Sequence, residues 1–287
     1  MINKKDTNYF FPRSIDINPT AKCNLACTFC WGPDHSIADS LSTEKWKKII
    51  QFFYDHGTDA IVFTGGEPLI RKDINELIRF AKLKGMRVTL STNAFFLQKR
   101  GNEILPYIDK VGIPIDGSNA ALNAKMRRGN SLSFKHAIDA LFYTKINYPR
   151  IQITVRTVVS KTNLSDILNI GQLLVKYQQY FDRWKIYEFT PVSVGKKYLL
   201  EHKLKLREFQ HTMSSLLNKY SSLPITIYPS EHRIGRYLFI GPDGDISVVD
   251  QKGEYKNIGN FYNISKTKLI KNVKSLVDIT RNSQHAH

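Results

Sequence analysis

Short apolar segments rich in β-branched residues alternate with longer amphipathic segments over most of the chain. The apolar segments predict six strands, at 14–19, 60–64, 86–92, 110–116, 150–160 and 184–192. Helical periodicity between them predicts helices near 43–56, 72–84, 99–109, 132–144 and 164–180. This alternation indicates right-handed βαβ units and a parallel sheet. Because a closed barrel needs eight units, we expect an α/β fold with a partial (β/α)6 TIM-like barrel over residues 10–192.

The pattern changes after residue 192. One more helix is expected near 205–220, and "FIGPDGDISVV" at 239–249 predicts a β-hairpin around a Pro-Asp-Gly-Asp turn. We therefore expect a second unit over residues 193–287, a small α+β extension that covers one end of the barrel as a lid over the substrate.

Composition is that of an ordinary globular protein, with 42% hydrophobic and 23% charged residues. The first residues do not resemble a signal peptide, and no run of apolar residues is long enough to cross a membrane, so a cytoplasmic protein is expected. The formal net charge of +17 favours anionic partners. Nucleic acid is a disfavoured partner, because the lysines are scattered singly and no nucleic-acid-binding motif is present.

All three cysteines of the chain, Cys23, Cys27 and Cys30, lie just after the first predicted strand. Their odd number and tight spacing argue against disulfides and for a metal. A structural zinc site needs four ligands, and His35 could supply the fourth in a non-catalytic zinc- or nucleic-acid-binding protein. The C-x3-C-x2-C spacing instead fits three corners of a [4Fe–4S] cluster and leaves one iron open, as a catalytic site requires.

Two segments carry a family resemblance. "CNLACTFC" (23–30) and "FTGGEP" (63–68) resemble the CxxxCxxC signature and the glycine-rich motif of the radical S-adenosylmethionine (SAM) superfamily. The resemblance implies that the methionine part of SAM chelates the open iron, and that reductive cleavage yields a 5′-deoxyadenosyl radical that abstracts a hydrogen atom from the substrate. It also implies an electron donor of the flavodoxin or ferredoxin type and chemistry carried out under anaerobic conditions.

The same resemblance indicates which residues contact SAM. They are Phe29, Gly65, Gly66, Glu67, Pro68, Ser91, Asn93, Arg156 and Asn163. Residue chemistry agrees for the glycine-rich turn, because two glycines let a ligand approach the backbone and the Glu67 carboxylate suits an ammonium group. Ser91, Thr92, Asn93 and Asn163 could instead be helix caps, since "NLSD" at 163–166 is a good helix start.

Substrate contacts are expected at strand ends and in the loop after the cysteines. The candidates are Asn18, Trp31, His35, Asp116 and Glu188. The Trp31 ring either stacks on a flat substrate or shields the cluster from water. Strand alternation, if it holds, places Glu188 inside the barrel, paired with a cation or binding a polar ligand, and places Tyr187 and Phe189 outside.

The extension has no cysteine for a second cluster, since Val248, Val249 and Asp250 stand where one would be expected. In plan, the chain is similar to single-cluster enzymes such as viperin-like nucleotide dehydratases and queuine lyase. This resemblance implies a small nucleotide- or nucleobase-like substrate, with modification of a ribosomally made peptide as the alternative. The subclass, lyase or oxidoreductase, stays open.

Overall fold

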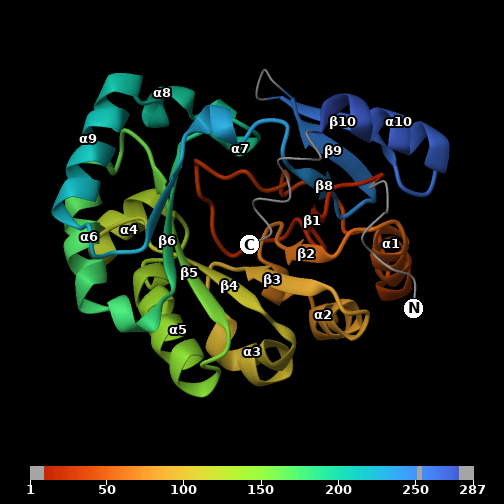
Figure 1. The fold of residues 1–287 in the computed structure, drawn as a ribbon, viewed down its shortest axis with the longest axis horizontal. Coiled ribbons are helices and arrows are strands. Elements are labelled where there is room, and N and C mark those ends of the chain that lie inside the picture. The colour runs from red at the N-terminus through yellow and green to blue at the C-terminus, as the bar shows by residue number, and fades with distance from the viewer. Residues whose placement is uncertain (1–9, 251–253, 278–287) are drawn as a thin grey trace.

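One ten-stranded sheet organises the part of the chain that the computed structural model describes, residues 10–250 and 254–277. The strand order is β10-β9-β8-β1-β2-β3-β4-β5-β6-β7, and the sheet curves around a central space (Figure 1). The strands are β1 Ser14–Ile17, β2 Ala60–Phe63, β3 Arg87–Ser91, β4 Lys110–Pro114, β5 Gln152–Val159, β6 Arg183–Glu188, β7 Ile225–Tyr228, β8 Leu238–Ile240, β9 Asp245–Val249 and β10 Tyr255–Asn260.

The six expected strands are β1 to β6, and each pairs in parallel with its neighbour in sequence. The partial barrel is therefore confirmed. The C-terminal extension adds a parallel strand at each side, β7 beside β6 and β8 beside β1, so the parallel part has two strands more than expected. The expected hairpin is the antiparallel pair of β8 and β9.

Helices flank the curved sheet, most of them on its outer face (Figure 1). They are α1 Thr43–Asp55, α2 Ile74–Leu83, α3 Leu97–Ile104, α4 Ala120–Met126, α5 Ser133–Asn147, α6 Ile167–Lys176, α7 Val194–Lys197, α8 Leu199–His202, α9 Leu206–Lys219 and α10 Lys266–Leu276. None of the described helices is long and apolar enough to span a membrane. The short helices α4, α7 and α8 were not expected from the sequence.

The main hydrophobic core lies between the sheet and these helices. In β6, for example, Trp184 and Ile186 are fully buried toward the helices, whereas Lys185 and Tyr187 face the central space. Because outward positions take the apolar residues, the inner face of the sheet is left for polar side chains. This division sets the chemistry of the barrel interior.

The expected division of the chain at 192/193 stays a prediction. Strands from both sides of that point belong to the same sheet, so the two parts are joined by backbone hydrogen bonds between strands. Residues 251–253 and 278–287 of the expected extension lie outside the described residues.

Candidate active site

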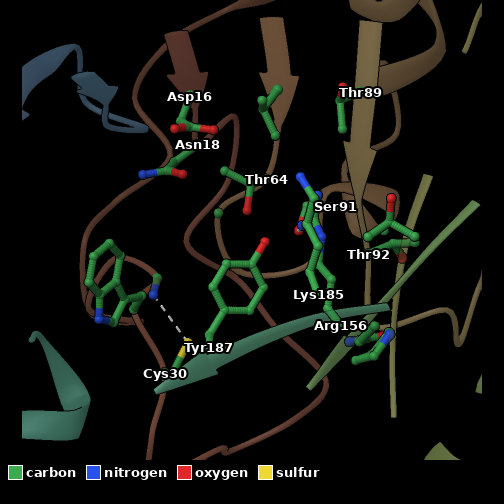
Figure 2. A pocket seen from close by; sticks show the side chains of 18 of the residues that line it. Asp16, Asn18, Cys30, Thr64, Thr89, Ser91, Thr92, Arg156, Lys185 and Tyr187 are labelled. Atoms are coloured by element: carbon green, nitrogen blue, oxygen red, sulfur yellow. Dashed lines mark hydrogen bonds between the residues drawn. The ribbon is translucent and has the colours of Figure 1, made fainter. Parts of the chain in front are cut away.

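A cavity of about 340 Å³ occupies the barrel interior. The three cysteines line it beyond the carboxyl ends of the strands, and Ser14 and Lys110, the first residues of β1 and β4, line it at the other end. Figure 2 shows polar side chains from several strands pointing into this one space. Parallel α/β folds bind ligands at the carboxyl ends of their strands, so this cavity is the candidate active site.

Cys23, Cys27 and Cys30 come together in the loop between β1 and α1, and none forms a disulfide. The Leu25 amide donates a hydrogen bond to the Cys23 Sγ at 3.4 Å, and the Gly32 amide donates one to the Cys30 Sγ at 3.2 Å. Burial is the main cause that raises the pKa of Cys23 to about 11 and that of Cys27 to about 12. Three sulfur donors facing one cavity fit the ligand set of a cluster with one open iron.

The zinc alternative is not supported. His35 is exposed and does not line the cavity. Among the described residues, no group of three or more His, Cys, Asp or Glu side chains is arranged to hold a single metal ion. The thiolates of an iron–sulfur cube bind different irons, so they need not converge on one point as zinc ligands do.

The glycine-rich turn after β2 packs directly against the cysteine loop. The Gly66 amide donates a hydrogen bond to the Thr20 carbonyl at 3.0 Å, and the Glu67 amide donates one to the Lys22 carbonyl at 2.8 Å. A Cβ at Gly66 would lie 2.2 Å from the Lys22 oxygen, and Gly65 has a φ of +115°. Both glycines line the cavity, and only glycine permits this close contact between the two segments.

Glu67 and Pro68 do not line the cavity, and their contact with SAM stays a prediction. The buried Glu67 carboxylate accepts hydrogen bonds from the Leu69 amide, the Thr92 hydroxyl and the Asn93 amide, at 3.0, 2.8 and 2.6 Å. The carboxylate therefore links the turn after β2 to the end of β3 through its hydrogen bonds. Burial raises the pKa of Glu67 to about 7, and these hydrogen bonds limit the rise.

Ser91, Thr92 and Asn93 line the cavity at the end of β3, and so does Phe29, so their contact with SAM stays a prediction. The Asn93 side-chain amide donates a hydrogen bond to the Asn24 side-chain oxygen at 2.8 Å, beside the cysteine loop. Polar groups at the end of β3 thus adjoin the three thiols.

Arg156 reaches across the cavity wall from β5 to β3, where its Nη1 donates a hydrogen bond to the Ser91 hydroxyl at 2.5 Å. Its Nε is buried without a hydrogen-bond partner. The guanidinium lies over Gly112 of β4, where a Cβ would be 2.2 Å from the Arg156 Cζ. The cavity thus holds one unsatisfied cationic donor at this point.

Asn163 does not line the cavity. Its amide donates to the carbonyls of Asp116 and Val158, both at 2.9 Å, and its oxygen accepts from the Ser160 amide at 2.9 Å. These bonds satisfy the side chain and fix the backbone after β5, and its contact with SAM stays a prediction.

Of the substrate candidates, Asn18 and Trp31 line the cavity, whereas His35, Asp116 and Glu188 do not. Asp116 is fully buried and pairs with Arg127 at 2.5 Å. The Glu188 carboxylate accepts a hydrogen bond from the Ser230 amide at 2.8 Å. These two acids therefore hold the protein together at the ends of β4 and β6.

Among the polar residues that line the cavity without having been singled out from the sequence are Asp16, Lys185 and Arg233. Tyr187 also lines it, which corrects the expectation that its ring faces outward. Burial raises the pKa of Asp16 to about 7 and lowers that of Lys185 to about 7. The alternation along β6 could have revealed Lys185 and Tyr187, because the apolar Trp184 and Ile186 occupy the positions that face the helices. Arg233 had no such signal, since it follows a short turn outside any strand.

Comparisons with known proteins agree with this geometry. The model of the radical SAM superfamily matches residues 17–174. The chain is similar to Fe-coproporphyrin III synthase of Methanosarcina barkeri, with 30% identity over 78% of this chain and 57% of that protein. It is also similar to an S-adenosylmethionine-dependent nucleotide dehydratase of Selenomonas ruminantium, with 26% identity over 86% of this chain and 89% of that protein. Streptococcus suis SuiB bound to its precursor peptide SuiA has the same fold, with a TM-score of 0.69 and 18% identity over 82% of this chain and 59% of SuiB.

Proposed function

The chain belongs to the radical SAM superfamily and is an enzyme that uses a [4Fe–4S] cluster and SAM, and we propose that Cys23, Cys27 and Cys30 are the cluster ligands. When bound, the cluster and SAM supply the 5′-deoxyadenosyl radical that abstracts a hydrogen atom from the substrate. The three thiols face one cavity, and the described lining of that cavity contains no histidine and no further cysteine. The Arg127 guanidinium opposes the effect of burial on the thiol pKa values, so it favours the thiolates that bind iron.

The groups that bind SAM in this proposal are those that line the cavity next to the cysteines. Gly65 and Gly66 expose backbone to the cavity, and Ser91, Thr92 and Asn93 offer hydroxyl and amide groups. The unpartnered Arg156 Nε supplies a positive charge for a carboxylate such as that of SAM. Phe29 adds an apolar surface. Glu67 contributes indirectly, because its carboxylate fixes the positions of Thr92 and Asn93 by hydrogen bonds.

For the substrate, we propose a small nucleotide-like molecule. The observation that carries this choice is the part of the cavity wall that is not assigned to SAM, where the aromatic rings of Trp31 and Tyr187 lie with the basic side chains of Lys185 and Arg233. The nucleotide dehydratase supports the choice, because the chain spans most of its length. SuiB shares only the fold at its low identity, so its bound peptide gives little support to the peptide alternative.

The test is an anaerobic assay of the reconstituted protein with SAM, a reductant and a panel of nucleotides deuterated on the ribose. We expect one of them to transfer deuterium into 5′-deoxyadenosine. Cys27→Ala should lose at least half of the bound iron and all of the 5′-deoxyadenosine, whereas Ala26→Ser, an exposed position in the same loop, should retain both. Deuterium transfer from a peptide but from no nucleotide would reject the proposed substrate, and turnover by Cys27→Ala would reject the cluster ligands.

A further inference from the structure

The segment between β7 and β8 places one buried guanidinium in the cavity wall. Arg233 is 9% exposed, and among the described residues its hydrogen bonding is limited to a long bond of 3.4 Å from Nη1 to the Glu188 carbonyl. Its Nε is buried without a partner, and within the described chain it pairs with no carboxylate. Burying a guanidinium without a counter-charge costs free energy, so a bound anion would stabilise this side chain.

Two aromatic rings hold this guanidinium in place. The Arg233 Cζ lies 3.8 Å from the centroid of the Trp31 ring and 4.8 Å from that of Tyr187. Such rings offset part of the lost hydration and fix the orientation of the side chain, but they accept no strong hydrogen bond. The arginine is therefore positioned in advance while its donors stay available.

Lys185 supplies a second basic group without a partner among the described residues; because burial lowers its pKa to about 7, an anion bound beside it would favour its charged form. Figure 2 shows it beside Tyr187 on β6, both pointing into the cavity. In the described part of the chain Lys185 has no hydrogen bond or ion pair, and its Nζ lies 5.5 Å from the Tyr228 ring, which stacks on Tyr187 at 5.1 Å. The same stack of rings thus contacts both Lys185 and Arg233. Arg156 is the register partner of Lys185 on β5, so positive charges adjoin one another here.

The carboxyl groups of the cavity do not balance these cations. Asp16 on β1 lines the same space and forms no ion pair with a described residue; burial raises its pKa to about 7, and the nearby Arg156 guanidinium limits the rise. Asp109 lies at the far end of the cavity and pairs with Lys82 at 2.5 Å. Among the described residues, therefore, no carboxylate forms an ion pair with Lys185 or Arg233.

We propose that Arg233 and Lys185 form a binding site for an anionic group, a phosphate or a carboxylate, on the substrate. The identification of that anion as part of the substrate rests on the proposed function. The C-terminal extension would thereby contribute a specificity residue to the active site. Two cations that approach one group from β6 and from the segment before β8 would bind it with charge-assisted hydrogen bonds.

Isothermal titration of the cluster-loaded protein with inorganic pyrophosphate and, separately, with glutarate tests the site without turnover. We expect one of the two anions to bind, and Arg233→Gln and Lys185→Met each to weaken its binding about 10-fold or more. Arg233→Lys should restore part of the affinity, because it keeps the charge. Arg207→Gln is the matched control, since it removes the same charge from an exposed position on α9 and should leave the affinity unchanged.

Binding of pyrophosphate alone would assign the site to phosphate, and binding of glutarate alone would assign it to carboxylate. The inference fails if neither anion binds, or if Arg207→Gln weakens binding as much as Arg233→Gln, because general surface charge would then explain it. A protein that binds an anion but transfers no deuterium from any nucleotide would retain the anion site and refute the proposed function. Deuterium transfer from a nucleotide without binding of either anion would support the proposed function and refute the anion site.

Discussion

At the scale of single residues, Gly112 makes room for the guanidinium of Arg156. Gly112→Ala would place a Cβ 2.2 Å from the Arg156 Cζ, so the side chain must move and lose its hydrogen bond to Ser91. We expect SAM to bind about 10-fold more weakly, the equivalent of one charge-assisted hydrogen bond, as measured by equilibrium binding to the cluster-loaded protein.

A double-mutant cycle isolates the cause of this effect. In an Arg156→Ala background the added methyl group has space, so Gly112→Ala should cost little further affinity. Additive losses in the double variant would show that Gly112 acts on the cavity by another route.

The carboxyl of Glu67 makes stability depend on pH. Its pKa is about 7 in the folded protein against an ordinary 4.5, so the folded state binds more protons between these values. Stability from this group is therefore lost as pH rises from about 4.5 to about 7. Glu67→Gln removes the titration and also sets an N–H against the Asn93 amide, at a constant cost of about 1–3 kcal/mol.

Urea unfolding of wild type and Glu67→Gln at several pH values between 5 and 8 measures this contribution. The advantage of wild type over the variant should shrink by about 2–3 kcal/mol across that range, because a shift of one pKa unit corresponds to about 1.4 kcal/mol. The exposed Glu103→Gln should show no such trend. A difference between wild type and Glu67→Gln that stays constant with pH would mean that Glu67 remains ionised throughout.

The sequence identified important side chains more reliably than it predicted the directions in which they point. The spacing of the cysteines and the glycine pair located the site, because both depend on local chain geometry. Alternation was expected to place Glu188 inside the barrel, yet Trp184 and Ile186, which share its parity in the strand, are buried toward the helices. Glu67 was expected to bind a ligand, and its carboxylate is used by partners that come from β3, far away in sequence.

At the scale of elements, the turn after β2 and the cysteine loop form one unit. In Gly66→Ala the new Cβ would lie 2.2 Å from the Lys22 carbonyl oxygen and 2.5 Å from that of Ala21, so the two segments must separate. We expect the iron content of the reconstituted protein to fall by more than half, because the cysteines would lose their support.

Thr64→Ser is the control for this prediction, since it alters the same turn without adding atoms. Iron analysis and thermal unfolding of both variants before reconstitution distinguish local from global damage. If Gly66→Ala bound iron as fully as wild type, the contact between the two segments would not be needed for cluster binding.

Regular alternation made the strands β1 to β6 predictable, whereas β7 and β8 escaped prediction as parts of the barrel. Both are short, with four and three residues, and neither is followed by the long helix that marks a βαβ unit. Their places are fixed by long-range pairing, since Ile240 pairs with Ile17 and Ile225 with Trp184. Such contacts leave little trace in the local pattern.

At the scale of the whole molecule, the extension completes the sheet that holds the active site. β8 lies along β1, where the Asn18 amide donates a hydrogen bond to the Ile240 carbonyl at 2.8 Å, and β7 lies along β6. Leu238 and Ile240 are fully buried, and each such side chain is worth about 1.5–3 kcal/mol of hydrophobic stabilisation. The two edge strands of the six-stranded part, β1 and β6, therefore find their partners in residues beyond 192.

A chain that ends at residue 192 would expose both edges as unpaired strands, which promote aggregation. We expect it to be insoluble or to lack cooperative thermal unfolding, as measured by size-exclusion chromatography and circular dichroism. A chain that ends at residue 277 keeps every described helix and strand and should unfold cooperatively near the temperature of the full chain. If the shorter chain folded as a monomer and bound iron, the barrel would be an independent domain, and the extension would serve the substrate alone.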